Sequence, residues 1–377
     1  MLAQILFLHN TYRTTGGEER VVEDLRWLAE TRLGRSTAFL KRDSAELGAR
    51  GAAVGLLRGG LEENAVAEAV RARGARVVHA HNLLPAFGWR ALRAAKEAGA
   101  RTVLHLHNYR LVCAVGTCFT NGGDCVRCHG RDTRPGVRLN CRGTYAEAAV
   151  YGASLALHQR RMAEFADVAV VPSQAAAQRL RELGAPLPDD VRVIPHVVRA
   201  FAAEPAFDPH GPALIASRLA PEKGVDTAID ACHRAGVPLV VAGDGPLAEE
   251  LRARAARLNA DVTFTGRVST ERLAELRAAA SVAVIPSRSA ETFGLAAAEA
   301  MAAGLPVAAT DIGALGELVP HEQLAAPGDA DALAAAVLRT RGRGDLAEEG
   351  LARVRAHAAP GVVAPLLEQV YADRANR

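Results

Sequence analysis

Two glutamates stand out in a stretch that consists otherwise mostly of alanine and glycine. Glu291 and Glu299 are separated by seven residues within Ser289–Gly304. A helix predicted to begin near Phe293 or Gly294 leaves Glu291 in the preceding loop and puts Glu299 one to two turns inside. A carboxylate accepts paired hydrogen bonds from vicinal hydroxyls, and a glycine lets a phosphate approach the free N–H groups of a first turn. The pattern favours one ligand with a sugar, a diphosphate and a ribose. The alternative is that Glu291 only stabilises the start of the helix and that Glu299 is a solvated surface residue.

Positive side chains follow another predicted strand. The loop S-R-L-A-P-E-K-G contains Arg218 and Lys223. Ligands of open α/β sheets bind beyond the carboxyl ends of the strands, so we expect this loop and the Glu291 loop at the same edge of a sheet. Two cations there would bind a diphosphate. The turns after two further strands supply the remaining expected contacts in this half, namely Gly243, Gly245, Arg267 and Val268.

Short apolar runs that alternate with amphipathic helical patterns must position these residues. The runs lack strict period-two alternation, and the pattern predicts an α/β protein with doubly wound parallel sheets. The predicted strands are Gln4–His9, Thr37–Lys41, Arg76–Ala80, Thr102–His107, Val168–Pro172, Val191–Ile194, Ala213–Ser217, Leu239–Gly243, Val262–Thr265, Val282–Pro286 and Val307–Ala309. A break at Pro205–Pro212 indicates two domains. We predict domains at residues 1–198 and 199–360, and a final helix at 361–377 that packs back on the first domain.

Five of the six cysteines lie in a glycine-rich segment at residues 110–143 that has no periodicity. The segment is too polar to form a core of its own, so a metal ion would replace one. The spacing predicts a structural Zn²⁺ with four thiolate ligands, and leaves Cys118 free. The predicted zinc ligands are Cys113, Cys125, Cys128 and Cys141. Disulfides, a redox pair and a c-type haem site at C-V-R-C-H remain as alternative interpretations.

The composition is that of a globular protein, with 49% hydrophobic and 23% charged residues in 377. No apolar run reaches the roughly 18 residues of a membrane span. The apolar N-terminal stretch is interpreted as a strand rather than a signal peptide, so we expect a cytoplasmic protein. The net charge of +3 is concentrated in a basic first half. That half is expected to attract an anionic acceptor or the inner face of a membrane.

Several of these motifs resemble those of a known family. The stretch E-T-F-G-L-A-A-A-E resembles the E-x7-E motif of the retaining glycosyltransferases of family 4, and S-R-L-A-P-E-K-G resembles their phosphate-contacting loop. The cysteine-rich segment is similar to an insertion carried by a subset of that family. The resemblance implies the GT-B fold, in which two Rossmann-like domains face a cleft. It also implies a nucleotide-diphosphate sugar as donor, with a UDP-sugar or a GDP-sugar favoured.

The resemblance implies roles for individual residues. Arg218 and Lys223 would bind the donor diphosphate, Glu291 the sugar and Glu299 the ribose. The amides of Gly294 and Leu295 would face the phosphate or sugar, at a helix start that includes Phe293. In the first half, T-G-G-E-E resembles the glycine loop that approaches the donor, which gives Gly16 and Gly17. His107 stands where the family has a histidine beside the transferred sugar. The expected catalytic residues are therefore His107, Arg218, Lys223 and Glu291.

Taken together, the sequence predicts a retaining transfer of a hexose-type sugar to a hydroxyl of a glycan, a lipid-linked acceptor or a natural product. The cations stabilise the leaving diphosphate, so no catalytic divalent metal is expected. Two rival functions remain: a GT-B epimerase that acts on a nucleotide sugar, and a zinc-dependent nucleic-acid-binding protein. The latter leaves both glutamates and both cations unexplained, so we expect no nucleic-acid partner. The other histidines near strand ends, His9, His79, His81 and His105, are interpreted as structural.

Overall fold

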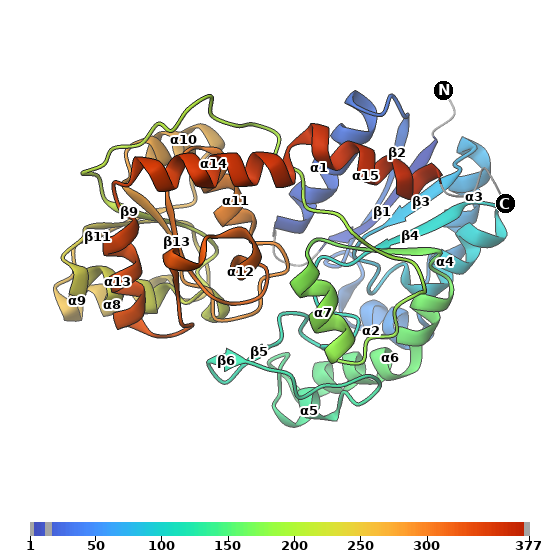
Figure 1. The fold of residues 1–377 in the computed structure, drawn as a ribbon. Coiled ribbons are helices and arrows are strands. Elements are labelled where there is room, and N and C mark those ends of the chain that lie inside the picture. The colour runs from blue at the N-terminus through green and yellow to red at the C-terminus, as the bar shows by residue number, and fades with distance from the viewer. Residues whose placement is uncertain (1–3, 12–16, 373–377) are drawn as a thin grey trace. The chain divides into compact units, whose positions relative to one another are not determined.

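The computed structural model describes residues 4–11 and 17–372, and the chain divides into two compact units. The first unit comprises Met1–Cys118, Cys125–Val197 and Pro360–Arg377. The second comprises Val198–Ala359 together with the short segment Phe119–Asp124. Each unit contains its own parallel sheet (Figure 1). The predicted α/β class with two doubly wound sheets is confirmed.

The sheet of the first unit has six strands in the order β2-β1-β3-β4-β7-β8, all parallel. The strands are β1 (Ile5–Thr11), β2 (Thr37–Asp43), β3 (Val77–Ala80), β4 (Arg101–His105), β7 (Val168–Val171) and β8 (Val191–Val193). Every residue of β1, β3, β4 and β7 is buried. Helices cover both faces of such a sheet, which explains the continuous apolar runs in these strands.

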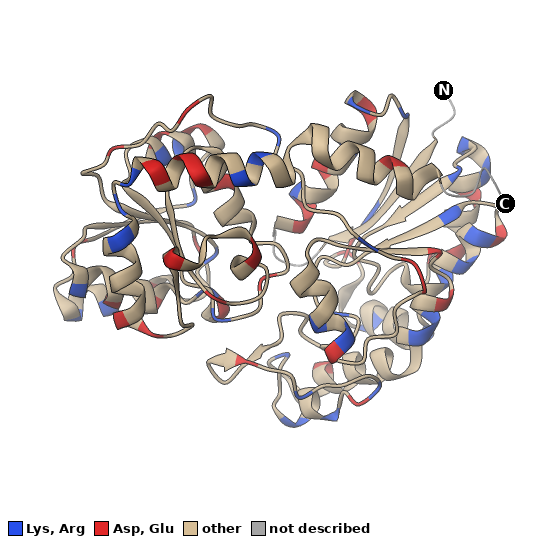
Figure 2. Ribbon diagram, viewed as in Figure 1, with Lys and Arg blue, Asp and Glu red and all other residues tan. Residues whose placement is uncertain are grey.

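The helices of the first unit are α1 (Gly17–Thr31), α2 (Gly48–Arg58), α3 (Glu63–Arg73), α4 (Gly88–Glu97), α6 (Tyr145–Glu164), α7 (Gln174–Glu182) and α15 (Pro360–Ala372). The last of these, α15, is attached by specific contacts. The Tyr371 hydroxyl lies 2.8 Å from His79 Nδ1, and Arg101 Nε donates to the Val370 carbonyl at 2.9 Å. Glu368 pairs with Arg35. Lys and Arg residues are spread over several helices of this unit, among Asp and Glu residues (Figure 2).

The cysteine-rich segment forms little regular structure. It contains the two-stranded hairpin of β5 (Phe119–Thr120) and β6 (Gly123–Asp124) and the short helix α5 (Arg134–Arg138). The Cys125 N–H donates to the Cys118 carbonyl at 2.7 Å, which closes the hairpin. All six cysteines are free thiols.

The sheet of the second unit has the order β11-β10-β9-β12-β13-β14, again all parallel. Its strands are β9 (Ala213–Ala216), β10 (Leu239–Ala242), β11 (Val262–Gly266), β12 (Val282–Ile285), β13 (Val307–Thr310) and β14 (Leu324–Ala325). Its helices are η1 (Pro221–Lys223), α8 (Val225–Ala235), α9 (Ala248–Leu258), α10 (Thr270–Ala278), α11 (Leu295–Ala302), α12 (Leu315–Leu318), η2 (His321–Gln323), α13 (Ala330–Thr340) and α14 (Gly344–Ala358). Residues of α8, α9 and α13 form one apolar core, and residues of α11, α12 and α14 form the other.

No described helix combines the length and the apolar character that a membrane crossing requires.

Candidate active site

The strand order of the second unit changes direction between β9 and β12, which are neighbours in the sheet. Connections leave in opposite directions at such a point, and ligands of open α/β sheets bind there. The loop after β9 carries Arg218 and Lys223, and the loop after β12 carries Glu291. Three of the expected catalytic residues therefore come from the two strands that flank the switch point.

Lys223 and Glu291 are in contact across this point. Lys223 Nζ donates to Glu291 Oε1 at 2.6 Å, and Ser287 Oγ donates to the same oxygen at 2.6 Å. Burial alone would raise the pKa of Glu291, but the charge and the hydrogen bond of Lys223, together with the Ser287 hydrogen bond, lower it. The carboxylate is therefore held ionised and ready to accept hydroxyl groups. Ser287 was missed in the sequence, although its position four residues before Glu291 puts it in the same loop.

A glycine fixes the Lys223 loop against the end of β12. Gly224 is the N-cap of α8 with φ 63°, and a Cβ there would lie 2.0 Å from the Pro286 carbonyl oxygen. The Arg288 N–H donates to the Glu222 carbonyl at 2.8 Å, and the Arg288 side chain pairs with Asp226 at 2.7 Å. The two loops thus form one assembly, and the sequence reasoning did not identify these supporting residues.

Arg218 lies in the same loop with its side chain 45% exposed. It pairs with Glu222, whose own backbone carbonyl supports the β12 loop. The sequence did not predict Glu222 as the partner of Arg218. The exposed guanidinium remains accessible to an anion from solvent, which is what its predicted role requires.

Gly243 and Gly245 position the Arg218 loop rather than leave space for a ligand. A Cβ at Gly243, which has φ 149°, would lie 1.8 Å from the Ser217 carbonyl oxygen. A Cβ at Gly245 would lie 2.5 Å from the Leu219 carbonyl oxygen. The turn after β10 therefore packs directly on the loop after β9. Both glycines were predicted to contact the donor. In the structure, the backbone of the Arg218 loop lies so close to them that no larger residue fits at either position.

The helix α11 begins as expected, at a glycine. Gly294 is its N-cap with φ 85°, and a Cβ there would lie 2.8 Å from Leu315 Cδ2. Leu295 is the first helical residue, so its amide is one of the free donors of the first turn. The Phe293 side chain is only 3% exposed and packs in the core, so its expected ligand contact is limited to the backbone.

Glu299 is not a solvated surface residue. Its carboxylate accepts a hydrogen bond from Arg277 of α10 at 2.7 Å, and both side chains are about 15% exposed. This partner was not predicted. Arg267 and Val268 follow β11 directly, and Val268 is partly buried against the core around α11.

His107 of the first unit lies just after β4 and lines a pocket. The polar lining residues are Glu18, His81, Asn82, His105, His107, Asn108, Arg110, Ser154, His158 and Gln159, and leucine side chains and Met162 complete the wall. Burial and the neighbouring histidines, His196 first among them, lower the pKa of His107 well below its ordinary value. The imidazole is therefore neutral at physiological pH. Gly17 opens α1, and Gly16 lies outside the described residues.

Six histidines gather near the carboxyl ends of β1, β3 and β4. The sequence did not predict that these histidines form a cluster. They are His9, His79, His81, His105, His107 and His196, and neighbouring rings stack, tilt against one another or meet edge to edge. The closest rings, His105 and His107, have centroids 4.2 Å apart. The signal was present, because H-A-H and H-L-H occur at corresponding ends of adjacent strands.

The four predicted zinc ligands interact, but they do not form a compact group. Burial raises the pKa of Cys128 to about 11, and so do the charges of Cys113, Cys141 and Cys125. A hydrogen bond from Cys118 and several backbone N–H groups lower the pKa of Cys113 to about 6. Within the described chain, the groups of three or more ligand atoms within 4.8 Å of one another consist of histidines, not cysteines.

Comparisons with known proteins cover both units. The family description "Glycosyl transferase 4-like domain" matches residues 11–196, and "Glycosyl transferases group 1" matches residues 212–341. Glycogen synthase of Mycobacterium tuberculosis is 40% identical over 161 residues, which cover 40% of this chain and 37% of that protein. A GDP-mannose-dependent alpha-(1-6)-phosphatidylinositol monomannoside mannosyltransferase of the same species is 38% identical over 120 residues, which cover 28% and 31%. The chain thus matches only about a third of the length of these relatives.

A solved structure extends the comparison over nearly the whole chain. The crystal structure of Anabaena HepE in complex with UDP and glucose has a TM-score of 0.65 at 20% identity, and covers 98% of this chain and 100% of that one. Likeness at this level of identity concerns the fold. The predicted GT-B fold, with two Rossmann-like parallel-sheet domains, is confirmed.

Proposed function

The chain belongs to the glycosyltransferases, with family matches over residues 11–196 and 212–341, and from this premise we propose that it is a retaining glycosyltransferase of family 4. It transfers a hexose-type sugar from a nucleotide-diphosphate donor to a hydroxyl of an acceptor. The main support is the contact between Lys223 and Glu291 at the switch point, 2.6 Å long and beside the glycine start of α11.

The reaction breaks the bond between the anomeric carbon and a phosphate oxygen. Negative charge then develops on the leaving diphosphate. Lys223, Arg218 and the free N–H groups of α11 stabilise that charge electrostatically, and Glu291 and Glu299 hold hydroxyls of the sugar and the ribose. Because Glu291 is already ionised and oriented by Lys223 and Ser287, little reorganisation is needed when the donor binds. This arrangement requires no catalytic divalent metal.

The first unit binds the acceptor in this proposal. Its pocket combines an apolar wall with the neutral imidazole of His107 and the side chains of Asn108 and Arg110. Such a lining suits a glycan, a lipid-linked acceptor or a natural product that presents a hydroxyl. We place the reaction in the cytoplasm, with contact to the inner face of a membrane through the basic first unit.

A nucleoside diphosphate is expected to stabilise the protein in a thermal-shift assay. One relative is a GDP-mannose-dependent mannosyltransferase and HepE was crystallised with UDP, so UDP and GDP are the first ligands to test. At 100 times the dissociation constant, the matching diphosphate is expected to raise Tm by roughly 5–10 °C. UMP and GMP are expected to have a much smaller effect, because they lack the second phosphate that Arg218 and Lys223 bind.

Arg218→Gln is expected to abolish most of this shift, because it removes one of the two cations. Arg234→Gln is the matched control, since Arg234 is also half-exposed and paired, with Asp331 at 2.6 Å, but lies in the last turn of α8, at the end away from the Lys223 loop. Equal shifts in both variants would contradict the assigned diphosphate site. If the protein epimerises the nucleotide sugar when no acceptor is present, the rival function of an epimerase is favoured.

A structural zinc at the cysteine-rich segment is a further part of the proposal. Burial and the charges of the other three cysteines raise the pKa of Cys128, and a Zn²⁺ among the four would neutralise those charges. Tetrahedral zinc holds its sulfurs about 3.8 Å apart, so the four sulfurs must gather to that spacing around the ion. Four thiolates leave no coordination position for a substrate, so the ion takes no part in the reaction. Its role is to fix the cysteine-rich segment, which follows β4 and His107.

Purified protein is expected to contain one thiolate-bound zinc per chain. Cys128→Ser is expected to lose this equivalent, because serine is a poor zinc ligand. Cys232→Ser is expected to retain it, because Cys232 is a buried thiol of α8 in the second unit. Metal analysis by mass spectrometry checks both. Equal zinc contents in the two variants would rule out the cysteine site.

A further inference from the structure

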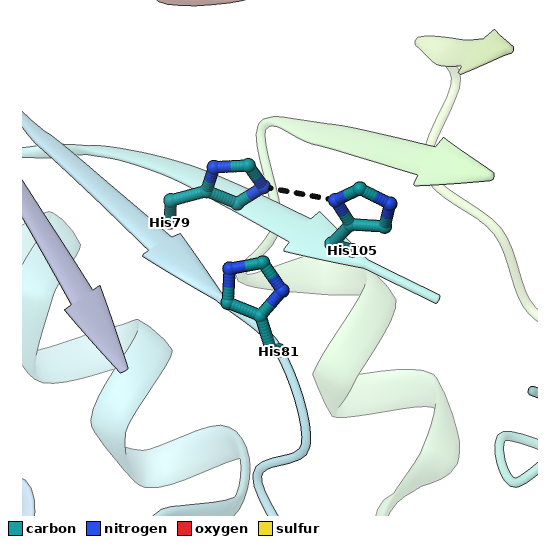
Figure 3. Close-up of side chains that lie close together, drawn as sticks. All are labelled: His79, His81 and His105. Atoms are coloured by element: carbon teal, nitrogen blue, oxygen red, sulfur yellow. Dashed lines mark hydrogen bonds between the residues drawn. The ribbon is translucent and has the colours of Figure 1, made fainter. Parts of the chain in front are cut away.

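Three buried histidines of the first unit bring their ring nitrogens together. His79 lies in β3 and His81 directly follows that strand, so their side chains leave the same face of the sheet. His105 ends the neighbouring strand β4. One ring nitrogen of each histidine lies within 4.8 Å of the other two, and none of the three residues is more than 3% exposed. Figure 3 shows the three rings at the strand ends.

The spacing of two of these nitrogens matches that of ligands on one ion. His79 Nε2 and His105 Nδ1 are 3.2 Å apart, joined by the dashed line in Figure 3. An ion that holds imidazole nitrogens at 2.0–2.1 Å in a tetrahedron separates them by about 3.3 Å. Without an ion the two nitrogens share one proton in a hydrogen bond. The distance between the two nitrogens can therefore stay as it is when an ion replaces the proton, but each ring must rotate to direct its electron pair at the ion, which lies beside the N–N line.

The outer nitrogens of His79 and His81 already have partners, whereas Nε2 of His105 has none in the described part of the chain. His79 Nδ1 lies 2.8 Å from the Tyr371 hydroxyl, and His81 Nδ1 lies 2.7 Å from His107 Nε2. Metal-binding histidines nearly always use the second ring nitrogen in this way, which sets the tautomer and the ring orientation. The remaining nitrogen of His81, Nε2, is buried without a hydrogen-bond partner in the described part of the chain. An ion would satisfy it.

Charge and access also favour an ion. Burial lowers the pKa of each of the three imidazoles well below its ordinary value, so the rings are neutral and offer free electron pairs at neutral pH. The pocket described above reaches His81 and His105, which gives an ion a path from solvent. The Glu18 carboxylate lines the same pocket and supplies negative charge near the site.

We propose that His79, His81 and His105 bind one divalent transition-metal ion, such as Zn²⁺, Ni²⁺ or Co²⁺, in the first unit. Imidazole is a preferred ligand of these ions. Tyr371 and His107 act as positioning residues that orient two of the ligands. Three protein ligands leave one tetrahedral position for water. The ion ties β3 and β4 to each other and, through Tyr371, to α15. The site shares no ligand with the cysteine-rich segment, and through His107 it adjoins the pocket proposed for the acceptor.

Cobalt distinguishes the two kinds of site in the wild-type protein. Protein stripped with a chelator under reducing conditions is titrated with Co²⁺ and followed by absorption. Thiolate ligands give strong sulfur-to-metal charge-transfer bands in the near ultraviolet, whereas imidazole ligands give the visible d–d bands alone. We expect one equivalent of Co²⁺ with d–d bands and no added charge-transfer absorption. The proposal is overturned if no Co²⁺ binds, or if every bound equivalent carries thiolate bands.

Variants test the ligands and the positioning residue separately. His105→Gln is expected to lose the thiolate-free equivalent, whereas His210→Gln, at an exposed histidine of the second unit, is expected to keep it. Tyr371→Phe leaves all three ligands in place and is expected to weaken Co²⁺ affinity by about 10–100-fold without changing the stoichiometry. If circular dichroism shows that His105→Gln is unfolded, the Co²⁺ affinity of Tyr371→Phe and the wild-type Co²⁺ spectrum decide whether the histidine site exists. Unchanged affinity in Tyr371→Phe would remove its positioning role, and an unchanged spectrum in folded His105→Gln would overturn the site.

Discussion

Lys223→Met is expected to lower the rate of donor cleavage by about 10²–10³-fold, the usual cost of removing one group that stabilises a developing anion. Lys223 is the cation closest to Glu291, and methionine keeps much of its length without the charge. The Glu291 carboxylate then loses the partner that lowers its pKa, so sugar positioning suffers as well. The measurement is the initial rate of UDP or GDP release from the nucleotide sugar whose diphosphate gives the larger thermal shift.

Lys96→Met provides the matched control for this result. Lys96 is also ion-paired, with Asp167 at 2.9 Å, but it lies on α4 of the first unit. The Asp167 side chain is only 6% exposed, but it keeps its hydrogen bonds from the Thr102 N–H and hydroxyl, which satisfy part of its charge when the Lys96 partner is lost. The control is expected to keep the wild-type rate. A Lys223→Met rate equal to that of the control would show that the diphosphate is bound elsewhere.

Acidification is expected to destabilise the metal-free protein steeply. Burial lowers the pKa of His79 and of His196 to about 3, whereas an exposed histidine has a pKa of about 6.5. Between these values the unfolded chain binds more protons than the folded chain, so the free energy of unfolding falls as pH falls. Each such histidine contributes about 1.4 kcal/mol per pH unit. The pair alone removes roughly 3 kcal/mol between pH 6.5 and pH 5, a large part of ordinary stability.

Urea unfolding at pH 7, 6 and 5 in the presence of EDTA measures this dependence. His196→Asn is expected to reduce the slope by about 1.4 kcal/mol per pH unit, because one buried group that cannot accept a proton has been removed. His210→Asn is expected to leave the slope unchanged, because His210 is exposed in the second unit. Identical slopes for the two variants would contradict the assignment of acid sensitivity to the buried histidines.

Most of the sheet architecture could be predicted because its central strands are short apolar runs that are fully buried. The strands β1 to β4 and β7 to β13 each overlap a predicted run. The strand β14 was missed because it has only two residues, Leu324 and Ala325, and is defined by pairing with β13. The hairpin of β5 and β6 was missed because its glycine-rich sequence has no apolar period.

The part of the site formed by loops after neighbouring strands could be predicted, because ligands of open α/β sheets bind at the carboxyl ends of the strands. The carboxyl-end rule placed Lys223 and Glu291 at one edge, and in the structure they are in contact. The rule says nothing about which helix packs beside α11, so the pairing of Arg277 with Glu299 could not be predicted. The cluster of six histidines was missed for a different reason. Each ring was judged alone, and only strand order and register bring them together.

The return of α15 has a consequence for how this protein can be divided and tagged. Apart from the short segment Phe119–Asp124, the chain passes between the units near Val197 and near Ala359, so the first unit is assembled from segments on both sides of the second. A contiguous fragment ending at residue 197 lacks Tyr371, Glu368 and the Val370 carbonyl, and exposes the surface they cover. Recombinant expression of the first unit therefore calls for a circularly permuted gene or a short graft that rejoins residues 360–372 to the N-terminal segment.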